Sequence, residues 1–508
     1  MNELRDESHV RGGPLHERRI VAACMDAASL TSLGADVLAG GIMGFLPPPS
    51  LFKCRRVNKM LRAVSDIAIA ALPRPVVLGG RSDAGNEDYQ YLENPDAYYD
   101  TVLRLAWQTM EWEPLPCMHH GRRDCAAAAL DDGSLIVVSG TRNEEKWSAE
   151  MLAPDGDVWQ DIPMPMPSGQ ADGVHLHAAL AALPGRCALL CGGRRSQVPR
   201  VGTTAAHVLD FAGDEAVWTQ VEDMSEPRHS HAAVSLPSGH VVVAGGADGT
   251  EYTHPYVSEI FDPISRSWLH GEDDCEWSNM QTARTEFSLT LAAVHPEGHL
   301  ADGGRRRTVA GLPPYSVLAL GGEGGSGGEM AMGAVTRCLE LTVHVGDYDG
   351  WSRALGKHHG WGEDEDDEEL GGGVVSRHGV RTCGWQISDV CVQRAVAGGC
   401  SVRGCVLLSG GEAKKAMPWK ASKEEDGKEA EARQMADLIP SSSSDDDDSE
   451  DNTRETKRKK KARKKRRKAR RSVLLFDPHE DRWYSLPPLP KARTCHAMVA
   501  PMERSFWL

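Results

Sequence analysis

The sequence has few features of a secreted or membrane protein. Its 13 cysteines include no Cys-x-x-Cys pair, and no Asn-x-Ser/Thr glycosylation sequon is present. The N-terminal residues are polar and charged, without the apolar core of a signal peptide. The most apolar early stretch, residues 21–46, contains two aspartates and several glycines, so it is a poor membrane span. We therefore expect reduced, intracellular thiols and no membrane association.

Motifs of catalysis and metal binding are also scarce. A GxGxxG pattern at residues 322–327 lacks a clear βαβ unit around it, so we reject nucleotide binding. Two His-x-His pairs, His175 with His177 and His229 with His231, have no further ligand set at metal-site spacing. We expect structural strand residues there, no metal, no cofactor and no bond chemistry performed by this chain.

Glycine and proline, by contrast, are abundant, with 52 and 29 of the 508 residues. This composition favours many short strands joined by turns. A chain of this length holds about three ordinary domains of ~150 residues each, unless it forms one large repeat fold. The repeats described next favour the single repeat fold.

One pattern recurs six times from residue 75 onward: an apolar run, a small-residue turn, a variable loop, a second apolar run and a tryptophan. The turns are Gly79-Gly80, Ser139-Gly140, Gly192-Gly193, Gly245-Gly246, Gly321-Gly322 and Gly410-Gly411. The tryptophans are Trp112, Trp159, Trp218, Trp268, Trp351 and Trp483. Repeats of about 50 residues with these features resemble kelch repeats. The resemblance implies a mainly β fold, a six-bladed kelch-type β-propeller of four-stranded blades.

The ends of the repeat region indicate how the ring closes. The first repeat begins at its second strand, residues 76–78, whereas the chain ends with an additional first strand at residues 496–500. This offset predicts a ring closed by the C-terminal strand, which protects the open edges of the terminal blades. An arginine opens the first strand of several repeats, namely Arg123, Arg228, Arg284 and Arg493.

The segment before the repeats has a different period. Apolar residues at spacings of three and four between residues 32 and 66 predict short amphipathic helices. Pro47, Pro48 and Pro49 end the first helix, and Ser50 is placed to cap the next. A unit of about 40 residues buries too little apolar surface to be stable alone, so we expect it to dock on a partner or on the next domain.

Residues 45–66, FLPPPSLFKCRRVNKMLRAVSD, resemble the second half of an F-box, where a Leu-x-x-Cys-x-x-Val-x-Lys run follows a proline-containing turn. The family usually has Leu-Pro where this chain has Leu33-Gly34, and Trp where Leu61 stands. An unrelated helical hairpin packed on the propeller is the alternative. The resemblance implies binding to the Skp-type adaptor of a cullin-RING ubiquitin ligase through Leu46, Pro47, Leu51, Phe52, Cys54, Val57 and Leu61.

These patterns divide the chain into a flexible tail at residues 1–29, the F-box-like α-helical motif at 30–71 and the propeller at 73–508. Two charged insertions, at about 357–385 and 412–471, are expected to be disordered. One face of the propeller collects the loops that follow the second and fourth strands. On it we expect a protein substrate to bind through Arg81, Arg142, Arg194, Arg195 and Arg228, although solvated charges or braces within a blade are the alternative.

The second insertion contains a basic block whose removal changes the formal net charge of the chain from -16 to -29. A strongly acidic remainder disfavours nucleic-acid binding, except through the block itself. The block resembles a nuclear import signal, so we expect the protein in the nucleus, the cytoplasm or both. Its 13 basic residues are Lys457, Arg458, Lys459, Lys460, Lys461, Arg463, Lys464, Lys465, Arg466, Arg467, Lys468, Arg470 and Arg471.

The two resemblances together predict the substrate-recognition subunit of an SCF-type cullin-RING ubiquitin ligase. Its expected partners are a Skp-type adaptor, a cullin and an unidentified protein substrate. The alternative is a kelch scaffold of the nucleus without a ligase, favoured if the N-terminal helices pack into the propeller. Some propellers of this type are enzymes, which would require three or more metal-binding or acid/base side chains converging at one end of the propeller axis.

Overall fold

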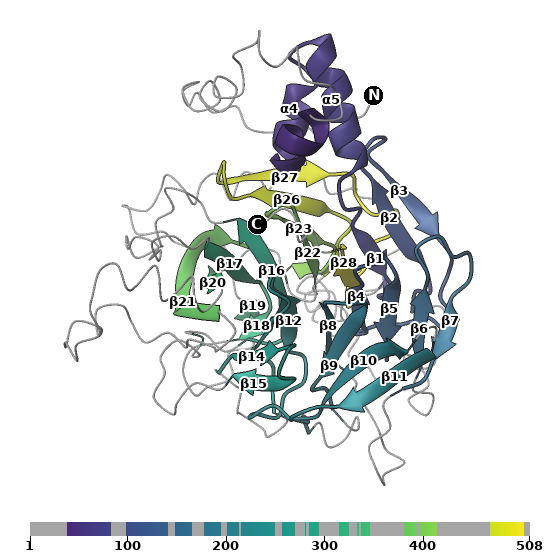
Figure 1. Cartoon of the computed structure of the whole chain (residues 1–508), viewed down its shortest axis with the longest axis vertical. Coiled ribbons are helices and arrows are strands. Elements are labelled where there is room, and N and C mark those ends of the chain that lie inside the picture. The colour runs from purple at the N-terminus through teal and green to yellow at the C-terminus, as the bar shows by residue number, and fades with distance from the viewer. Residues whose placement is uncertain are drawn as a thin grey trace, which may run out of the picture.

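The computed structural model describes residues 38–82, 98–140, 148–164, 177–194, 201–212, 215–248, 257–269, 280, 284–293, 314–324, 333–334, 337–345, 380–392 (plus 394), 397–413 and 468–501. Six four-stranded antiparallel sheets surround a central axis, and a small helical unit stands on the rim (Figure 1). The predicted six-bladed β-propeller is confirmed. None of the helices in these residues is long and apolar enough to cross a membrane.

The blades follow one another in chain order, each with its first strand innermost. Blade 1 contains β28 (Ala497–Val499), β1 (Val76–Leu78), β2 (Val102–Ala106) and β3 (Glu111–Leu115). Blade 2 contains β4 (Ala126–Ala129), β5 (Leu135–Val138), β6 (Ala149–Leu152) and β7 (Gln160–Ile162). Blade 3 contains β8 (Ala179–Leu183), β9 (Cys187–Cys191), β10 (Ala206–Ala212) and β11 (Glu215–Gln220).

Blade 4 contains β12 (Ala232–Ser235), β13 (Val241–Ala244), β14 (Glu259–Asp262) and β15 (Ser267–Leu269). Blade 5 contains β16 (Ser288–Ala293), β17 (Pro314–Leu320), β20 (Arg337–Val345) and β21 (Val380–Cys391). Blade 6 contains β22 (Gly398–Val402), β23 (Cys405–Ser409), β26 (Val473–Asp477) and β27 (Arg482–Leu486). Two short ribbons extend blades 5 and 6: β18 (Glu323–Gly324) with β19 (Gly333–Ala334), and β24 (Glu412–Ala413) with β25 (Lys468–Ala469).

Strand β28 closes the ring. It pairs antiparallel with β1, and Val77 lies opposite Met498. The prediction that the C-terminal strand completes the first blade is therefore confirmed. Among the described strands, blade 1 alone combines strands from opposite ends of the sequence, and we call the pairing of β28 with β1, together with the adjoining face of blade 6, the closure seam.

The glycine turns form hydrogen bonds with the backbone of the next blade. In the turn after β13, a Cβ on Gly245 would lie 2.7 Å from the carbonyl oxygen of Arg284, and its φ is +65°, so only glycine fits without strain. The second residue of the turn, Gly246, donates its N–H to that same carbonyl at 2.7 Å. Equivalent N–H bonds run from Gly80 to Arg122, Gly193 to Arg228, Gly322 to Arg394 and Gly411 to Arg493.

The arginine that receives this bond then braces its own blade. The Nη1 atom of Arg228 donates to the carbonyl oxygen of Gly245, the first residue of the next glycine turn. The same bond joins Arg122 to Ser139, Arg284 to Gly321, Arg394 to Gly410 and Arg493 to Gly79. Turn, backbone carbonyl, guanidinium and next turn thus alternate around the ring, and we call this chain of bonds the glycine–arginine relay.

Tryptophans join the outer strands of neighbouring blades. The indole N–H of Trp159, beside β7, donates to the carbonyl oxygen of Pro116, which follows the outer strand of blade 1. The same arrangement links Trp112 to Pro487, Trp218 to Pro163 and Trp268 to Glu222 at 2.6–2.8 Å. Each of these blade interfaces therefore contains a large apolar ring whose polar atom is satisfied by the neighbouring blade.

Three sequence-based assignments need correction. Trp385 on β21 is the buried tryptophan of blade 5, whereas Trp351 lies outside the described residues. The first insertion ends earlier than 385, because β21 begins at Val380, and the second is shorter at both ends, because β24 and β25 are paired strands. Arg122 rather than Arg123 opens blade 2, since Arg122 occupies the relay position.

The helical unit comprises η1 (Leu38–Ile42), η2 (Met43–Phe45), α4 (Pro48–Cys54) and α5 (Lys59–Ala70). Pro47 is the N-cap of α4, with prolines in the first turn, where their fixed φ suits the helix. Ser50 lies inside α4, so the expectation that it caps this helix was wrong. Asn58 caps α5 by accepting the N–H of Leu61 at 2.8 Å.

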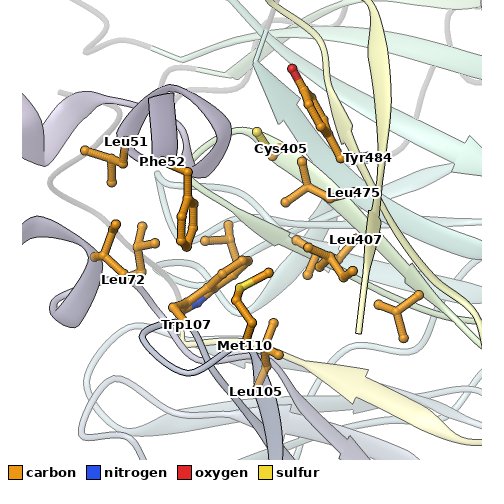
Figure 2. Packing of buried hydrophobic residues seen from close by; sticks show 14 of the residues in the cluster. Leu51, Phe52, Leu72, Leu105, Trp107, Met110, Cys405, Leu407, Leu475 and Tyr484 are labelled. Carbon is orange, nitrogen blue, oxygen red and sulfur yellow. The ribbon is translucent and has the colours of Figure 1, made fainter. Parts of the chain in front are cut away.

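The inner side of this unit is buried over the closure seam. A single apolar cluster contains Leu51, Phe52 and Leu72 of the unit, Leu105, Trp107 and Met110 of blade 1, and Cys405, Leu407, Leu475 and Tyr484 of blade 6 (Figure 2). Polar contacts reinforce it: Lys53 on α4 binds Glu480 at 2.7 Å, and Arg403 donates to the carbonyl oxygen of Met43 at 3.3 Å. The unit and the seam therefore share one core.

Replacing Phe52 with alanine should lower the free energy of unfolding by about 3 kcal/mol or more, because it leaves a cavity in the shared core. Val57→Ala, at an exposed position of the same unit, should change it by less than about 0.5 kcal/mol. Denaturant unfolding followed by tryptophan fluorescence measures both. Equal stabilities of the two variants would contradict the shared core.

His496→Phe should make the protein less sensitive to acid. The imidazole is buried, and this burial, together with Arg493 and Arg394, lowers the pKa of His496 to about 3. In the unfolded chain the imidazole binds a proton near pH 6.5, whereas in the folded chain it stays neutral down to about pH 3. The contribution of His496 to the free energy of unfolding is therefore complete above pH 6.5 and is lost as the pH falls toward 3. Phe287 already occupies the corresponding place in blade 5, against Gly245 as His496 lies against Gly410.

The measurement is the free energy of unfolding of both proteins between pH 7 and pH 4. We expect the variant to lose stability less steeply than the parent below pH 6.5. Parallel pH profiles would show that His496 is not held neutral.

Candidate functional site

Residues between the relay arginines and the first strands form an inner ring around the propeller axis. Five of them have left-handed backbones, with φ of 50–55°: Asp124, His177, Ser230, Glu286 and Cys495. Backbone N–H groups link them from blade to blade, from Asp124 to Cys495, from Ser230 to His177 and from Glu286 to Ser230. We call the end of the propeller that carries these residues and the glycine turns the turn face.

On blades 1 and 2 the turn face carries two partly exposed arginines beside a tyrosine. Arg81 directly follows the Gly79-Gly80 turn, and its backbone bridges to Tyr98. The guanidinium of Arg123 lies over the Tyr98 ring, 5.0 Å from its centre. Acidic neighbours are at longer range, with Arg81 4.0 Å from Glu412 and Arg123 3.7 Å from Asp124.

Blade 3 contributes a buried arginine and a histidine. Nη2 of Arg194 lies 3.0 Å from Nε2 of His177. This contact places the imidazole directly beside a guanidinium at the turn face. The ring of His177 also lies 6.4 Å from that of His229 on blade 4.

The Asp124 carboxylate lies between the arginines of blades 1 and 2 and His177 of blade 3. Burial raises the pKa of Asp124, but the neighbouring His177, Arg123 and Arg81 outweigh burial and hold the pKa below its ordinary value. The Cys495 thiol hydrogen-bonds this carboxylate, and burial followed by Asp124 keeps the pKa of Cys495 well above its usual range. The site therefore contains an ionised carboxylate among cations and a neutral thiol.

The arginines expected to bind substrate fall into three groups. Arg81 and Arg194 do lie at the turn face. Arg228 is wholly buried and donates to Val257 and Glu259 as well as Gly245, so it braces blade 4 from within. Arg142 and Arg195 lie outside the described residues. The sequence analysis missed Tyr98 as a member of this site, because only the fold brings Tyr98 to the turn of Arg81.

Two groups that resemble reactive sites have structural roles. Sγ of Cys191 lies 3.7 Å from Nε2 of His231, but burial raises the pKa of the thiol to about 12 and lowers that of the imidazole, so both are neutral. His119, Glu150 and Asp161 lie close enough together to bind a metal ion. However, Glu150 already pairs with Arg122 and accepts the backbone N–H of His119, so its carboxylate serves the fold.

Some of the residues expected to contact an adaptor are buried by the packing of the helical unit, and others are exposed. Leu51 and Phe52 are buried in the shared core, and Leu46, Cys54 and Leu61 pack partly against it. Pro47 is also buried, whereas Val57 is exposed. Large apolar side chains on the outside of the unit are Phe45, Val57 and Ile67, which are 53%, 51% and 42% exposed.

The end of the basic block belongs to the propeller. Lys468 lies in β25, Arg470 bridges to Arg493, and Nε of Arg471 donates to the carbonyl oxygen of Leu489 at 2.7 Å. The ten basic residues from Lys457 to Arg467 lie outside the described residues.

We compared the sequence and the fold with known proteins. No family model matches the sequence. An F-box/kelch-repeat protein of Arabidopsis thaliana is 28% identical over 170 residues, which cover 30% of this chain and 43% of that relative. The match thus spans less than half of the relative's length. The solved structure of YjhT aligns with 53% of this chain and 78% of its own, at 15% identity and a TM-score of 0.36.

Arg228→Met should reduce stability, because it leaves the buried carboxylate of Glu259 without its charged partner. Removing one member of a buried ion pair costs about 3–5 kcal/mol. The double variant Arg228→Met, Glu259→Leu should recover part of the loss. Denaturant unfolding measures both, and a parent-like stability of the single variant would show that Arg228 is not a brace.

Proposed function

We propose that this chain, whose partial sequence match and six-bladed propeller support the F-box/kelch-repeat family, is the substrate-recognition subunit of an SCF-type cullin-RING ubiquitin ligase. The helical unit would bind a Skp-type adaptor, which connects to a cullin, and the propeller would bind a protein substrate. The observation that carries the proposal is that Phe45, Val57 and Ile67 of the helical unit stay exposed although the unit is fixed to the propeller by the shared core.

The outward side of the helical unit has the properties of a docking surface. Phe45, Val57 and Ile67 are exposed apolar side chains, and Lys59 and Arg62 on α5 are exposed cations. Exposed apolar residues combined with charged ones are typical of protein interfaces. Leu51 and Phe52 are used to hold the unit on the propeller, so the adaptor would contact the outer residues instead.

The proposed mechanism is tethering. A helical unit fixed on the rim gives the turn face a constant orientation relative to the adaptor, and a substrate bound there would be held near the ubiquitin-transferring subunits. This raises the effective concentration of the substrate without any reaction at this chain.

The alternative function is a kelch scaffold without a ligase. It is favoured by the burial of Leu51 and Phe52, because a helical hairpin that only clamps the closure seam would have this packing. The two functions differ in what the outer side of the unit binds.

Co-purification with the adaptor and cullin tests the choice. We expect recovery of both with the intact chain and their loss, by about tenfold or more, with Val57→Asp, Ile67→Asp, because two buried charges would disrupt an apolar contact. The matched control is Val217→Asp on β11, where valine is 44% exposed but far from the unit in the sequence and in the ring (Figure 1).

Recovery with the intact chain and the control, but not with the double variant, supports the receptor. Failure of the intact chain to recover the adaptor would leave the scaffold as the function. Equal recovery with all three proteins would mean that the adaptor binds elsewhere.

A further inference from the structure

The turn face of blades 1–3 gathers positive charge on an acidic chain. The formal net charge is -16, and it is -29 without the 13 basic residues of residues 457–471. Against that background, Arg81 and Arg123 lie beside one carboxylate, Asp124, and Arg194 contacts the neighbouring His177. A local excess of cations on an acidic protein attracts an anionic group to that place.

The partly exposed arginines Arg81 and Arg123 are held in position before any ligand binds. The backbone of Arg81 exchanges hydrogen bonds with Thr494 at 2.9 and 3.0 Å, and Arg123 donates its N–H to Gly140 at 2.9 Å. The Tyr98 ring supports the guanidinium of Arg123. A preorganised side chain loses less entropy on binding, and tyrosine and arginine are the residues that most often dominate interfaces.

Their ion pairs within the protein are long. A charge-assisted N–H···O bond spans about 2.7–2.9 Å. The relay arginine Arg228 reaches its carboxylate at 2.6 Å, whereas Arg81 and Arg123 are 4.0 and 3.7 Å from theirs. The partly exposed arginines therefore gain shorter charge-assisted bonds if an external carboxylate approaches.

We propose that the turn face of blades 1 and 2 binds a glutamate or aspartate side chain of an acidic protein segment, with Arg81 and Arg123 contacting the carboxylate and Tyr98 contacting the adjacent chain. The two guanidinium groups are offset only by carboxylates at 4.0 and 3.7 Å, and an external carboxylate can accept two parallel N–H bonds from one guanidinium. The inference rests on the proposed function, since the segment would belong to the substrate.

The test is fluorescence anisotropy with a fluorescein-labelled hexaglutamate peptide. To remove binding by the basic block, the full-length chain would carry serine at its ten basic residues between 457 and 467. Arg81→Gln, Arg123→Gln is compared with Arg104→Gln on β2. Arg104 is a matched control, because its side chain is 25% exposed, as is that of Arg123, and it also has a long ion pair.

We expect the double variant to weaken peptide binding about tenfold or more, and Arg104→Gln to change it less than about twofold. A hexaglutamine peptide should not bind. Unchanged binding by the double variant, or equal binding of hexaglutamine, would overturn the proposal. Stronger binding of a peptide with one phosphoserine among glutamines than of hexaglutamate would overturn the choice of carboxylate.

Co-purification with the adaptor separates this inference from the proposed function. If Arg81→Gln, Arg123→Gln retains the adaptor, as we expect, the loss of peptide binding belongs to the turn face. Peptide binding by a chain that recovers no adaptor would support the site and remove the ligase.

Discussion

The glycine–arginine relay is the constraint on which the ring depends. Each relay bond crosses from one blade to the next, and each arginine then fastens its own blade to the following turn. Where the first turn residue is glycine it has to lack a side chain, since a Cβ on Gly410 would lie 2.4 Å from the carbonyl oxygen of Arg493; in blade 2 this position is Ser139. Five blades contain the arginine within the described residues, and the corresponding position of blade 3, His175, falls outside them. A frame of backbone bonds and buried guanidinium groups leaves the surrounding loops free to vary in length.

The closure seam is where this frame has least covalent support, because β28 and β1 come from opposite ends of the chain. Three further interactions lie there: the relay bond from Arg493 to Gly79, the indole bond from Trp112 to Pro487, and the apolar cluster under the helical unit. The helical unit thus stabilises the joint that needs it most. The same packing fixes the direction in which its outer residues face, so stability and orientation have a common origin in this core.

The sequence was sufficient for the propeller because its strongest signals, glycine pairs and tryptophans, report contacts that every blade repeats. It failed where a contact depends on a neighbour without a fixed spacing. Trp385 replaces Trp351 because the insertion in blade 5 displaces the outer strand, and nothing in the local pattern marks where that strand begins. Similarly, the spacing of Leu51 and Phe52 predicts an apolar stripe, but not whether an adaptor or the propeller covers it. Only the docked structure shows that the propeller does.

Arg122 and Arg123 show how closely the frame and the candidate site adjoin. Arg122 is buried and bonded to Ser139 and Ser148, whereas the next residue directs its guanidinium over Tyr98 at the surface. The two arginines are consecutive in the sequence, yet their side chains point to different places. The left-handed backbone of Asp124 follows them directly and leads the chain into β4. Replacing Arg122 would disturb the blade, and with it the position of Arg123. Loss of ligand binding on such a replacement therefore does not identify a contact residue, and substitutions that spare the relay, such as those at Arg81 and Arg123, are needed to separate recognition from folding.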